Sequence, residues 1–374
     1  MKTQVSIAKY PDLEEAINLI GGLGKYVKPG DRVFVKPNAC VPKTNSTGTV
    51  SSPELIFRVL RLLKNITDNI AVGDSPFAVF RDIKNLKVSG IVEAAEKARV
   101  EVVNLNRSER VKKGSFYIAK PVVDADVLIN VPVMKTHERT GVTLSLKNIM
   151  GVVPANLKHE MHKQGLEERI VDLNKSVKPS LIIMDANVCQ EGGGPVNGTP
   201  KKMGLIIVGT NPVAVDSVCC KIMGIAPRSI KHLVLAEKEK IGSMDDIDIL
   251  GFKEEYISKF DMPKTYNSNL VKFCVENAEA PIQKFIERYN KINFNWDKCS
   301  KCGLCVKSCP EKIIKLNDKG PVCNHEKCIL CLCCYETCLE NAISIKESFY
   351  RRSIINLIRK ILSSKAKDNE YIRT

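Results

Sequence analysis

Two cysteine runs near the C-terminal end constrain this 374-residue chain more than any other feature. Both runs have the spacing C-x2-C-x2-C-x3-C, which is the bacterial [4Fe-4S] signature. The first run consists of Cys299, Cys302, Cys305 and Cys309, and the second of Cys328, Cys331, Cys334 and Cys338. In this signature three closely spaced cysteines bind three corners of a cuboidal cluster, and the fourth binds the other cluster. The spacing therefore predicts a small fold that holds two [4Fe-4S] clusters.

The predicted ligands form two sets that exchange their last members. We expect one cluster to be held by Cys299, Cys302, Cys305 and Cys338, and the other by Cys309, Cys328, Cys331 and Cys334. Zinc is the alternative metal, but a zinc site needs four ligands and seldom has two matching runs. Over this stretch the sequence resembles two-cluster bacterial ferredoxins, with Leu339 in place of the usual proline after the last cysteine. This resemblance implies electron transfer.

Two further cysteines, Cys323 and Cys333, are surplus to this pattern. Cys333 lies between two predicted ligands, where it could form a hydrogen bond or replace a neighbour after oxidative loss. We favour a simpler interpretation, in which it is a small buried residue.

The distribution of the 15 cysteines favours metal binding over disulfides, since ten of them lie between residues 299 and 338. The chain shows no signal peptide at its start and no apolar stretch of about 20 residues that would cross a bilayer. A cytoplasmic location is expected, where thiol pools keep cysteines reduced.

The formal net charge of +15 favours an anionic partner. An acidic redox protein, a phosphorylated or carboxylated substrate, a membrane surface and nucleic acid all fit this charge. Nucleic acid is not expected, because aromatic residues make up only 6% and no RNA-binding or helix-turn-helix motif is present. The expected partners are a redox protein or a small anionic substrate.

Strand-like and helix-like segments alternate over the first 250 or so residues. The predicted strands are Val5–Lys9, Arg32–Lys36, Ile70–Val72, Glu101–Leu105, Ala125–Val131, Leu181–Asp185 and Gly204–Val208. The predicted helices are Leu13–Tyr26, Pro53–Leu63, Ile91–Ala98 and segments near Ala214–Met223 and Ile230–Ile241. Such alternation is typical of an α/β domain with a largely parallel sheet and flanking helices.

Four regions follow from these patterns. They are an α/β domain (1–254), a connecting segment with one helix at Pro281–Tyr289 (255–294), an α+β two-cluster module (295–346) and a basic amphipathic tail (347–374). In the tail, Phe349–Leu362 predicts a helix with one apolar face. That helix either packs on the body of the protein or contacts a membrane surface or a partner.

Polar residues follow several of the predicted strands, and open α/β sheets place their ligand sites where strands end. The candidate site residues are Lys36, Asp74, Lys135, His137, Lys147 and Asn148. The Lys147-Asn148 pair interrupts an apolar run, which is costly unless the pair has partners. The lysines suit an anionic substrate, and His137 or Asp74 suits proton transfer.

Two other motifs are weaker. His159 and His162 lack the i, i+4 spacing of a zinc-protease helix, so a surface or loop pair is preferred to a metal site. The glycines at 192–194 could approach a phosphate, but no dinucleotide-binding or Walker pattern surrounds them.

Several of these segments together resemble the family of uncharacterised iron–sulfur proteins called domain of unknown function 362. They are residues 35–38, 74–76, 132–137, 146–151 and 191–195, with Asp216. The family is found mostly in anaerobic bacteria and archaea, often fused to a ferredoxin. The resemblance implies the fold and the clusters but not the reaction.

Three functions remain open. The first is a redox protein, such as a ferredoxin-linked oxidoreductase, in which the clusters exchange electrons with a site in the α/β domain. The second is a non-catalytic electron carrier that docks another oxidoreductase. The third is a scaffold for assembling a metal or cofactor, using the spare cysteines with His159 and His162.

Overall fold

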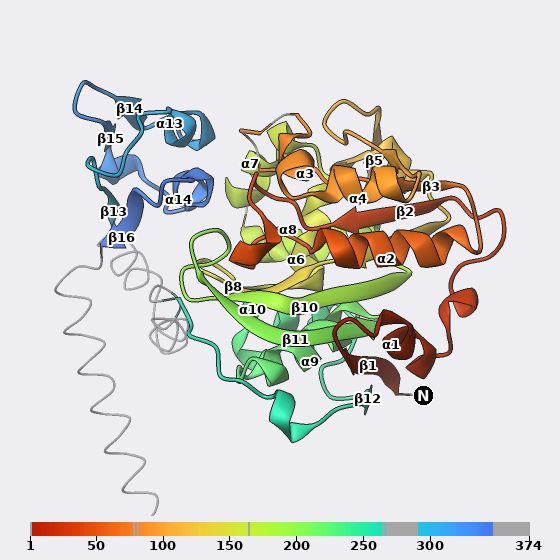
Figure 1. Ribbon diagram of the computed structural model, residues 1–374. Helices are drawn as coiled ribbons and strands as arrows, with labels where there is room; N and C mark the ends of the chain where they lie inside the picture. The colour runs from red at the N-terminus through yellow and green to blue at the C-terminus, as the bar shows by residue number, and fades with distance from the viewer. Residues whose placement is uncertain are drawn as a thin grey trace, which may run out of the picture. The chain divides into compact units, whose positions relative to one another are not determined.

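The computed structural model describes residues 2–77, 79–80, 82–163, 165–263, 266 and 291–346. The chain divides into two compact units, Met1–Pro263 and Lys264–Thr374, each described by itself below (Figure 1). The expected helices at Pro281–Tyr289 and Phe349–Leu362 lie outside the described residues. No helix in the described ranges is long and apolar enough to span a membrane.

The first unit is built on a ten-stranded mixed sheet with the order β12-β1-β11-β10-β7-β2-β3-β4. These strands are β1 (Thr3–Lys9), β2 (Val33–Pro37), β3 (Ile70–Val72), β4 (Glu101–Val102), β7 (Val127–Val131), β10 (Leu181–Glu191), β11 (Thr199–Gly209) and β12 (Ile247–Leu250). Off this path, β8 (Val133–His137) pairs with β10 and with β9 (Gly141–Thr143). Six of the nine described pairings in this sheet are parallel, so the predicted α/β class and largely parallel sheet are confirmed.

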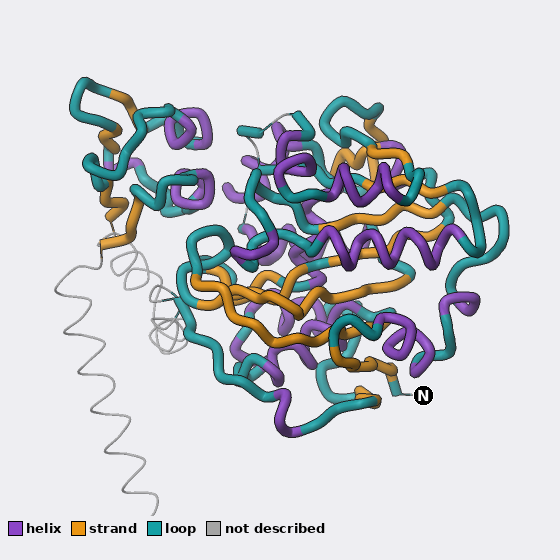
Figure 2. Tube along the Cα trace, viewed as in Figure 1, coloured by secondary structure: helices purple, strands orange, loops and turns teal. Residues whose placement is uncertain are grey.

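Helices flank both faces of this sheet (Figures 1 and 2). Their bounds are α1 (Leu13–Leu19), α2 (Pro53–Lys64), α3 (Lys84–Val88), α4 (Ile91–Lys97), α5 (Lys120–Val123), α6 (Ser145–Asn148), α7 (Lys158–Lys163), α8 (Leu166–Ser176), α9 (Pro212–Ile222) and α10 (Lys231–Lys238). A separate hairpin joins β5 (Arg110–Lys113) to β6 (Phe116–Ala119). One large apolar core holds α1, α2 and α4 against the sheet, while α6, α8, α9 and α10 pack together elsewhere.

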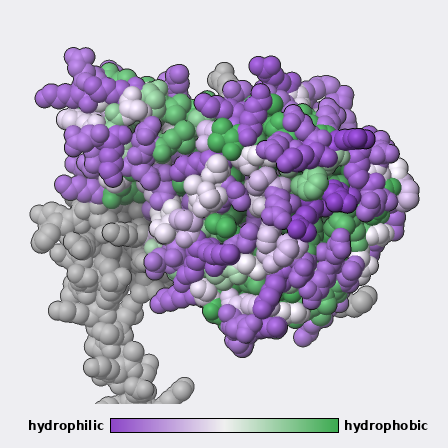
Figure 3. Space-filling view, viewed as in Figure 1, coloured by the Kyte–Doolittle hydropathy of each residue, from purple (hydrophilic) through white to green (hydrophobic). Residues whose placement is uncertain are grey.

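Alternation along β2 determines which side chains enter this core. Val33 and Val35 belong to the core beneath α1, α2 and α4, so Lys36 projects from the opposite face. There Lys36 lies in register with Asn130 of the neighbouring strand β7. The visible face of the first unit is largely hydrophilic, with only scattered hydrophobic residues (Figure 3). Lys36 on β2 and Asn130 on β7, in contrast, are polar residues that are completely buried.

Helix α2 shows how closely local sequence determines an element here. Ser52 caps the helix by accepting a hydrogen bond from the N–H of Leu55, and Pro53 occupies the first turn. The predicted helix at 53–63 is therefore confirmed to within one residue. By contrast, the predicted helix Leu13–Tyr26 is wrong beyond Leu19, because Gly21 and Gly22 adopt positive φ angles that end it.

Strand structure is found beyond the ends of two predicted strands. β10 continues past Asp185 to Glu191, with a bulge between Ala186 and Val188. Residues 133–137, for which the sequence pattern predicts no element, form β8. Buried polar residues were interpreted as strand ends, although their hydrogen bonds allow them to lie within a sheet.

The second unit contains two short antiparallel sheets and two short helices. β13 (Lys291–Phe294) pairs with β16 (Ile343–Lys346), and β14 (Ile314–Leu316) pairs with β15 (Pro321–Cys323). The sheet of this unit thus begins at Lys291, before residue 295 where the module was expected to start. Helices α13 (Leu304–Ser308) and α14 (Cys333–Thr337) each contain the third cysteine of one run.

Candidate functional site

Cysteines from both runs line one small cavity in the second unit. They are Cys299, Cys302, Cys305 and Cys338, and apolar residues such as Phe294, Leu304 and Ile343 complete the wall. Cys299 and Cys302 come from the loop before α13, Cys305 lies in α13 itself, and Cys338 directly follows α14. The fold thus brings the last cysteine of the second run to the first run.

The other four predicted ligands also lie near one another. Burial raises the pKa of the Cys334 thiol well above its usual value, and the nearby Cys331, Cys328 and Cys309 raise it further. Cys309 likewise acts on Cys328. Cys309 of the first run therefore lies near the second run, as the exchanged arrangement requires, although Cys305 also acts on Cys334.

Each proposed donor set consists of four thiols, and thiolates are the donors that iron–sulfur clusters use. Within the described ranges, no group of three or more His, Cys, Asp or Glu side chains could hold one metal ion. Burial raises the pKa of Cys305 to about 11, so cluster binding must displace thiol protons.

The two surplus cysteines both lie beside the second ligand set. Cys333 is completely buried and forms a side-chain hydrogen bond with Cys331. Burial raises the pKa of Cys323 to about 12, and Cys328, Cys309 and Cys331 contribute further. Spacing alone contains no signal that would place Cys323 here.

In the first unit, a buried ion pair joins two of the predicted site residues. Lys36 Nζ lies 2.8 Å from Asp74 Oδ1, and both side chains are almost wholly inaccessible. Asp74 Oδ2 accepts a hydrogen bond of 2.7 Å from the N–H of Ala39. Burial lowers the pKa of Lys36, and Asp74 partly offsets this effect. A Cβ on Gly151 would overlap Asp74 Oδ1, so glycine permits this close approach.

A network of amides adjoins this pair. Lys135, fully buried on β8, donates to Asn38 Oδ1 at 2.9 Å and to the Thr49 carbonyl at 2.6 Å. Asn38 Nδ2 donates to Asn148 Oδ1 at 2.7 Å, and Asn148 Nδ2 donates to Asn130 Oδ1 at 2.8 Å. The structure therefore brings Lys135 and Asn148, predicted separately, into one buried network.

Helix α6, which carries Lys147 and Asn148, is held at its start by Asp216. The Asp216 carboxylate accepts hydrogen bonds from the N–H groups of Ser145 at 2.7 Å and Leu146 at 3.0 Å. Burial raises the pKa of Asp216 to about 8, although these two hydrogen bonds lower it. Asp216 is thus a positioning residue for the site.

His137 is a neutral imidazole in this structure. Its Nδ1 accepts hydrogen bonds from the N–H groups of Arg139 at 3.0 Å and Thr140 at 3.3 Å, which leaves the ring proton on Nε2. Burial, followed by the charge of Lys147, lowers its pKa well below 6.5. A role as a charged acid is therefore unfavourable, and its proton-transfer role remains a prediction.

The motif containing His159 and His162 contributes a residue that the sequence analysis passed over. Lys158, at the start of α7, is only 6% exposed, and its Nζ donates to the carbonyls of Ser75 at 2.5 Å and Pro76 at 3.0 Å. Burial lowers its pKa to about 7. His162 is also buried, whereas the histidines had been preferred as a surface or loop pair. Along the sequence, Lys158 is one of several neighbouring polar residues, and no periodic pattern marks it as buried.

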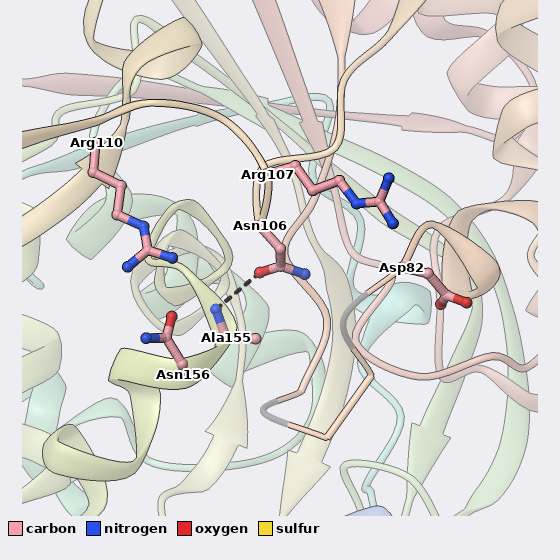
Figure 4. Close-up of a pocket in the computed structure, with 6 residues that line it drawn as sticks. All are labelled: Asp82, Asn106, Arg107, Arg110, Ala155 and Asn156. Atoms are coloured by element: carbon pink, nitrogen blue, oxygen red, sulfur yellow. Dashed lines mark hydrogen bonds between the residues drawn. The ribbon is translucent and has the colours of Figure 1, made fainter.

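A cavity of about 430 Å³ lies beside the Asp74–Ser75 turn. Asp82, Asn106, Arg107, Arg110, Ala155 and Asn156 line it (Figure 4). Asn106 Oδ1 accepts hydrogen bonds from Ser75 Oγ at 2.8 Å and from the Ala155 N–H at 2.9 Å. Asn106 therefore connects this cavity to the turn that carries Asp74.

Comparison with known proteins gives two family matches. A family described as "Domain of unknown function (DUF362)" matches residues 33–221, which include every candidate residue of the first unit. A family described as "4Fe-4S binding domain" matches residues 292–315.

Two individual proteins are also similar to this chain. The thylakoid-associated protein sll1697 of Synechocystis sp. is 28% identical over 241 residues, covering 62% of this chain and 74% of that protein. Among solved structures, the lactate racemase apoprotein from Thermoanaerobacterium thermosaccharolyticum is similar with a TM-score of 0.37 and 14% identity. That similarity covers 60% of this chain and 58% of the racemase chain, which is less than two thirds of its length.

Proposed function

This chain belongs to the DUF362 family and carries a 4Fe-4S binding domain, and we propose that it is an electron-transfer protein with two [4Fe-4S] clusters. One observation carries the proposal. Cys338 of the second run lines the same cavity as Cys299, Cys302 and Cys305 of the first, which is the ligand exchange that two clusters require.

The ligand sets follow from that arrangement. One cluster would be held by Cys299, Cys302, Cys305 and Cys338, and the other by Cys309, Cys328, Cys331 and Cys334. When bound, such clusters supply one-electron transfer at potentials set by hydrogen bonds, charge and exposure. The chain itself contributes a mostly apolar wall around the first ligand set, and turns that position the thiols.

We further propose that the first unit uses those electrons at a site for a small anionic substrate. Lys36 and Lys135 would bind the anion, and Lys147 lies on the short helix positioned by Asp216. Asp74 holds Lys36 in place through their 2.8 Å ion pair. Because water is largely excluded from these side chains, a bound anion would interact with them strongly.

Metal analysis tests the first part of the proposal. The full chain, reconstituted with iron and sulfide without oxygen, should contain about eight iron atoms and show paramagnetic signals when reduced at low temperature. Cys305→Ala should lose about half of the iron. Cys333→Ala is the matched control, because Cys333 is another buried cysteine of the same unit outside the proposed ligand sets, and its iron should be unchanged. A colourless protein without such signals would refute the proposal.

Substrate-dependent oxidation tests the second part. Small carboxylates and phosphates are added to the reduced protein, and the visible absorbance of the clusters reports their oxidation. An anion that oxidises the wild type should have little effect on Lys36→Met, whereas Lys97→Met should behave as wild type, because Lys97 is an exposed lysine paired with Glu93. Equal oxidation of all three proteins would place the reaction elsewhere.

A further inference from the structure

The cavity beside the Asp74–Ser75 turn lies at an edge of the sheet where three strands end. β3 pairs in parallel with both β2 and β4, so the segments that follow these strands meet at one edge. Asn106 lies on the segment after β4, and its Oδ1 accepts a hydrogen bond from Ser75 Oγ after β3. Open α/β sheets bind ligands at this edge, and about 430 Å³ is a usual volume for a small-molecule site.

The side chains that line this cavity carry a net positive charge. Arg107 and Arg110 are exposed, and neither guanidinium group has an ion pair or hydrogen bond with a residue that the structure describes. The lining also includes the carboxylate of Asp82, whose Oδ1 accepts a hydrogen bond of 3.1 Å from the Lys84 N–H. Two cations therefore face one carboxylate, and the donors of both arginines remain available to a ligand.

The backbone that carries the two arginines is held in place. Asn104 accepts a hydrogen bond of 3.0 Å at its side-chain Oδ1 from the Asn106 N–H, and one of 3.0 Å at its carbonyl from the Arg107 N–H. Arg110 begins β5 and lies in register with Ala119 of β6. The two guanidinium groups thus extend from a fixed turn and from a paired strand.

A third segment completes the lining. The short 3-10 helix Ala155–Leu157 precedes α7, and the Ala155 N–H donates to Asn106 Oδ1 at 2.9 Å. This bond holds the next residue, Asn156, at the cavity, where Figure 4 shows it on the same side of Asn106 as Arg110. An amide group both donates and accepts hydrogen bonds, so it suits a polar ligand.

We propose that this cavity binds a small molecule whose phosphate or carboxylate group is held by Arg107 and Arg110, and whose hydroxyl groups donate to Asp82. The fork of N–H donors on a guanidinium group matches the oxygens of either anion. An ionised carboxylate only accepts hydrogen bonds, so Asp82 selects a ligand with donors. This site goes beyond the proposed function, because the described lining includes none of the lysines assigned to that function.

Calorimetric titration of the full chain with its clusters reconstituted tests the proposal. Glycerol 3-phosphate and glycerate are the probes, and they distinguish a phosphate from a carboxylate. At least one of them should bind with a Kd below about 1 mM. Each probe is compared with its analogue without hydroxyl groups, propyl phosphate or propanoate. The hydroxylated probe should bind about fivefold or more tightly than its analogue, because it alone donates to the carboxylate.

Three variants assign the binding to the cavity. Arg107→Met and Arg110→Met should each weaken binding of the hydroxylated probe about tenfold or more, because each loses charge-assisted hydrogen bonds. Asp82→Ala should abolish the preference for the hydroxylated probe over its analogue. Arg99→Met is the matched control, since Arg99 is also an exposed arginine without an ion pair among the described residues, and its affinity should be unchanged.

Two results would overturn the proposal. One is the absence of binding by both hydroxylated probes at about 10 mM, and the other is unchanged affinity in both arginine variants. Equal affinities of a probe and its analogue would overturn the role given to Asp82. The titration involves no electron transfer, so binding that depends on the arginines without cluster oxidation by any anion would count against the proposed function alone.

Discussion

The two units place their functional residues in opposite ways. In the second unit, the eight cysteines proposed as ligands lie within 40 residues, and their spacing is visible along the chain. In the first unit, Lys36, Asp74, Lys135, Asn148 and Lys158 come from strands, short helices and the turn after β3, spread over more than 120 residues. The second unit encodes its site locally, whereas the first assembles its site through the topology of the sheet.

This difference determines which substitutions each unit tolerates. A ligand cysteine has a single chemical role, so its loss should remove a cluster with little effect on the first unit. The lysines and amides of the first unit are buried polar groups, so they contribute to stability as well as to the proposed chemistry. Variants should therefore separate metal content from stability.

The largest expected effect contrasts the two units directly. Cys334→Ala should lose about half of the bound iron while the first unit keeps its stability. Asp74→Asn should keep all its iron. Iron analysis measures the metal content, and urea unfolding monitored by circular dichroism measures the stability of the first unit. Iron loss in Asp74→Asn would show that the metal content also depends on the first unit.

Within the first unit, removing one member of the buried ion pair should be costly. Asp74→Asn leaves the Lys36 ammonium without its carboxylate and should reduce the free energy of unfolding by about 3 kcal/mol. The double variant Lys36→Met/Asp74→Leu removes both charges and should be more stable than Asp74→Asn. If the double variant were the less stable protein, the pair would contribute net stability.

A smaller loss is expected when the space beside this pair is filled. Gly151→Ala places a methyl group against Asp74 Oδ1 and within 2.6 Å of Lys36 atoms, which should cost about 2 kcal/mol. Gly24→Ala is a suitable control, because a Cβ there has no neighbour within 4 Å. Equal unfolding free energies for the two variants would show that the pair can move aside.

The pH dependence of stability should reveal Lys158. Burial gives it a folded-state pKa of about 7, against 10.5 in the unfolded chain, so the unfolded state binds more protons between these values. The free energy of unfolding should therefore rise with pH through this window by up to about 1.4 kcal/mol per unit, relative to Lys158→Met. Urea titrations at pH 7, 8 and 9 measure the difference, and parallel profiles would exclude an uncharged Lys158.

The same contrast explains which features of the two units could be predicted from the sequence. Helix α2 was predicted to within one residue because its cap, its proline and its apolar spacing are local. The two cysteine ligand sets are likewise predicted from local spacing alone. β8 was not predicted, since its pairing with β10 involves residues about 50 positions away.

Lys158 was missed for a related reason. It belongs to no periodic pattern or spacing motif, and a lysine in a polar segment is normally exposed. Only the packing of α7 against the turn after β3 buries it. Its burial depends on contacts that no single stretch of sequence contains.

The central claim, that two clusters exchange their last ligands, is tested most directly by the iron content of two double variants. Cys302→Ala/Cys338→Ala removes two ligands of one proposed cluster, so about half of the iron should remain. Cys331→Ala/Cys338→Ala removes one ligand from each cluster, so nearly all of the iron should be lost. The reverse result, with half of the iron kept in the second variant and almost none in the first, would show that each run binds its own cluster.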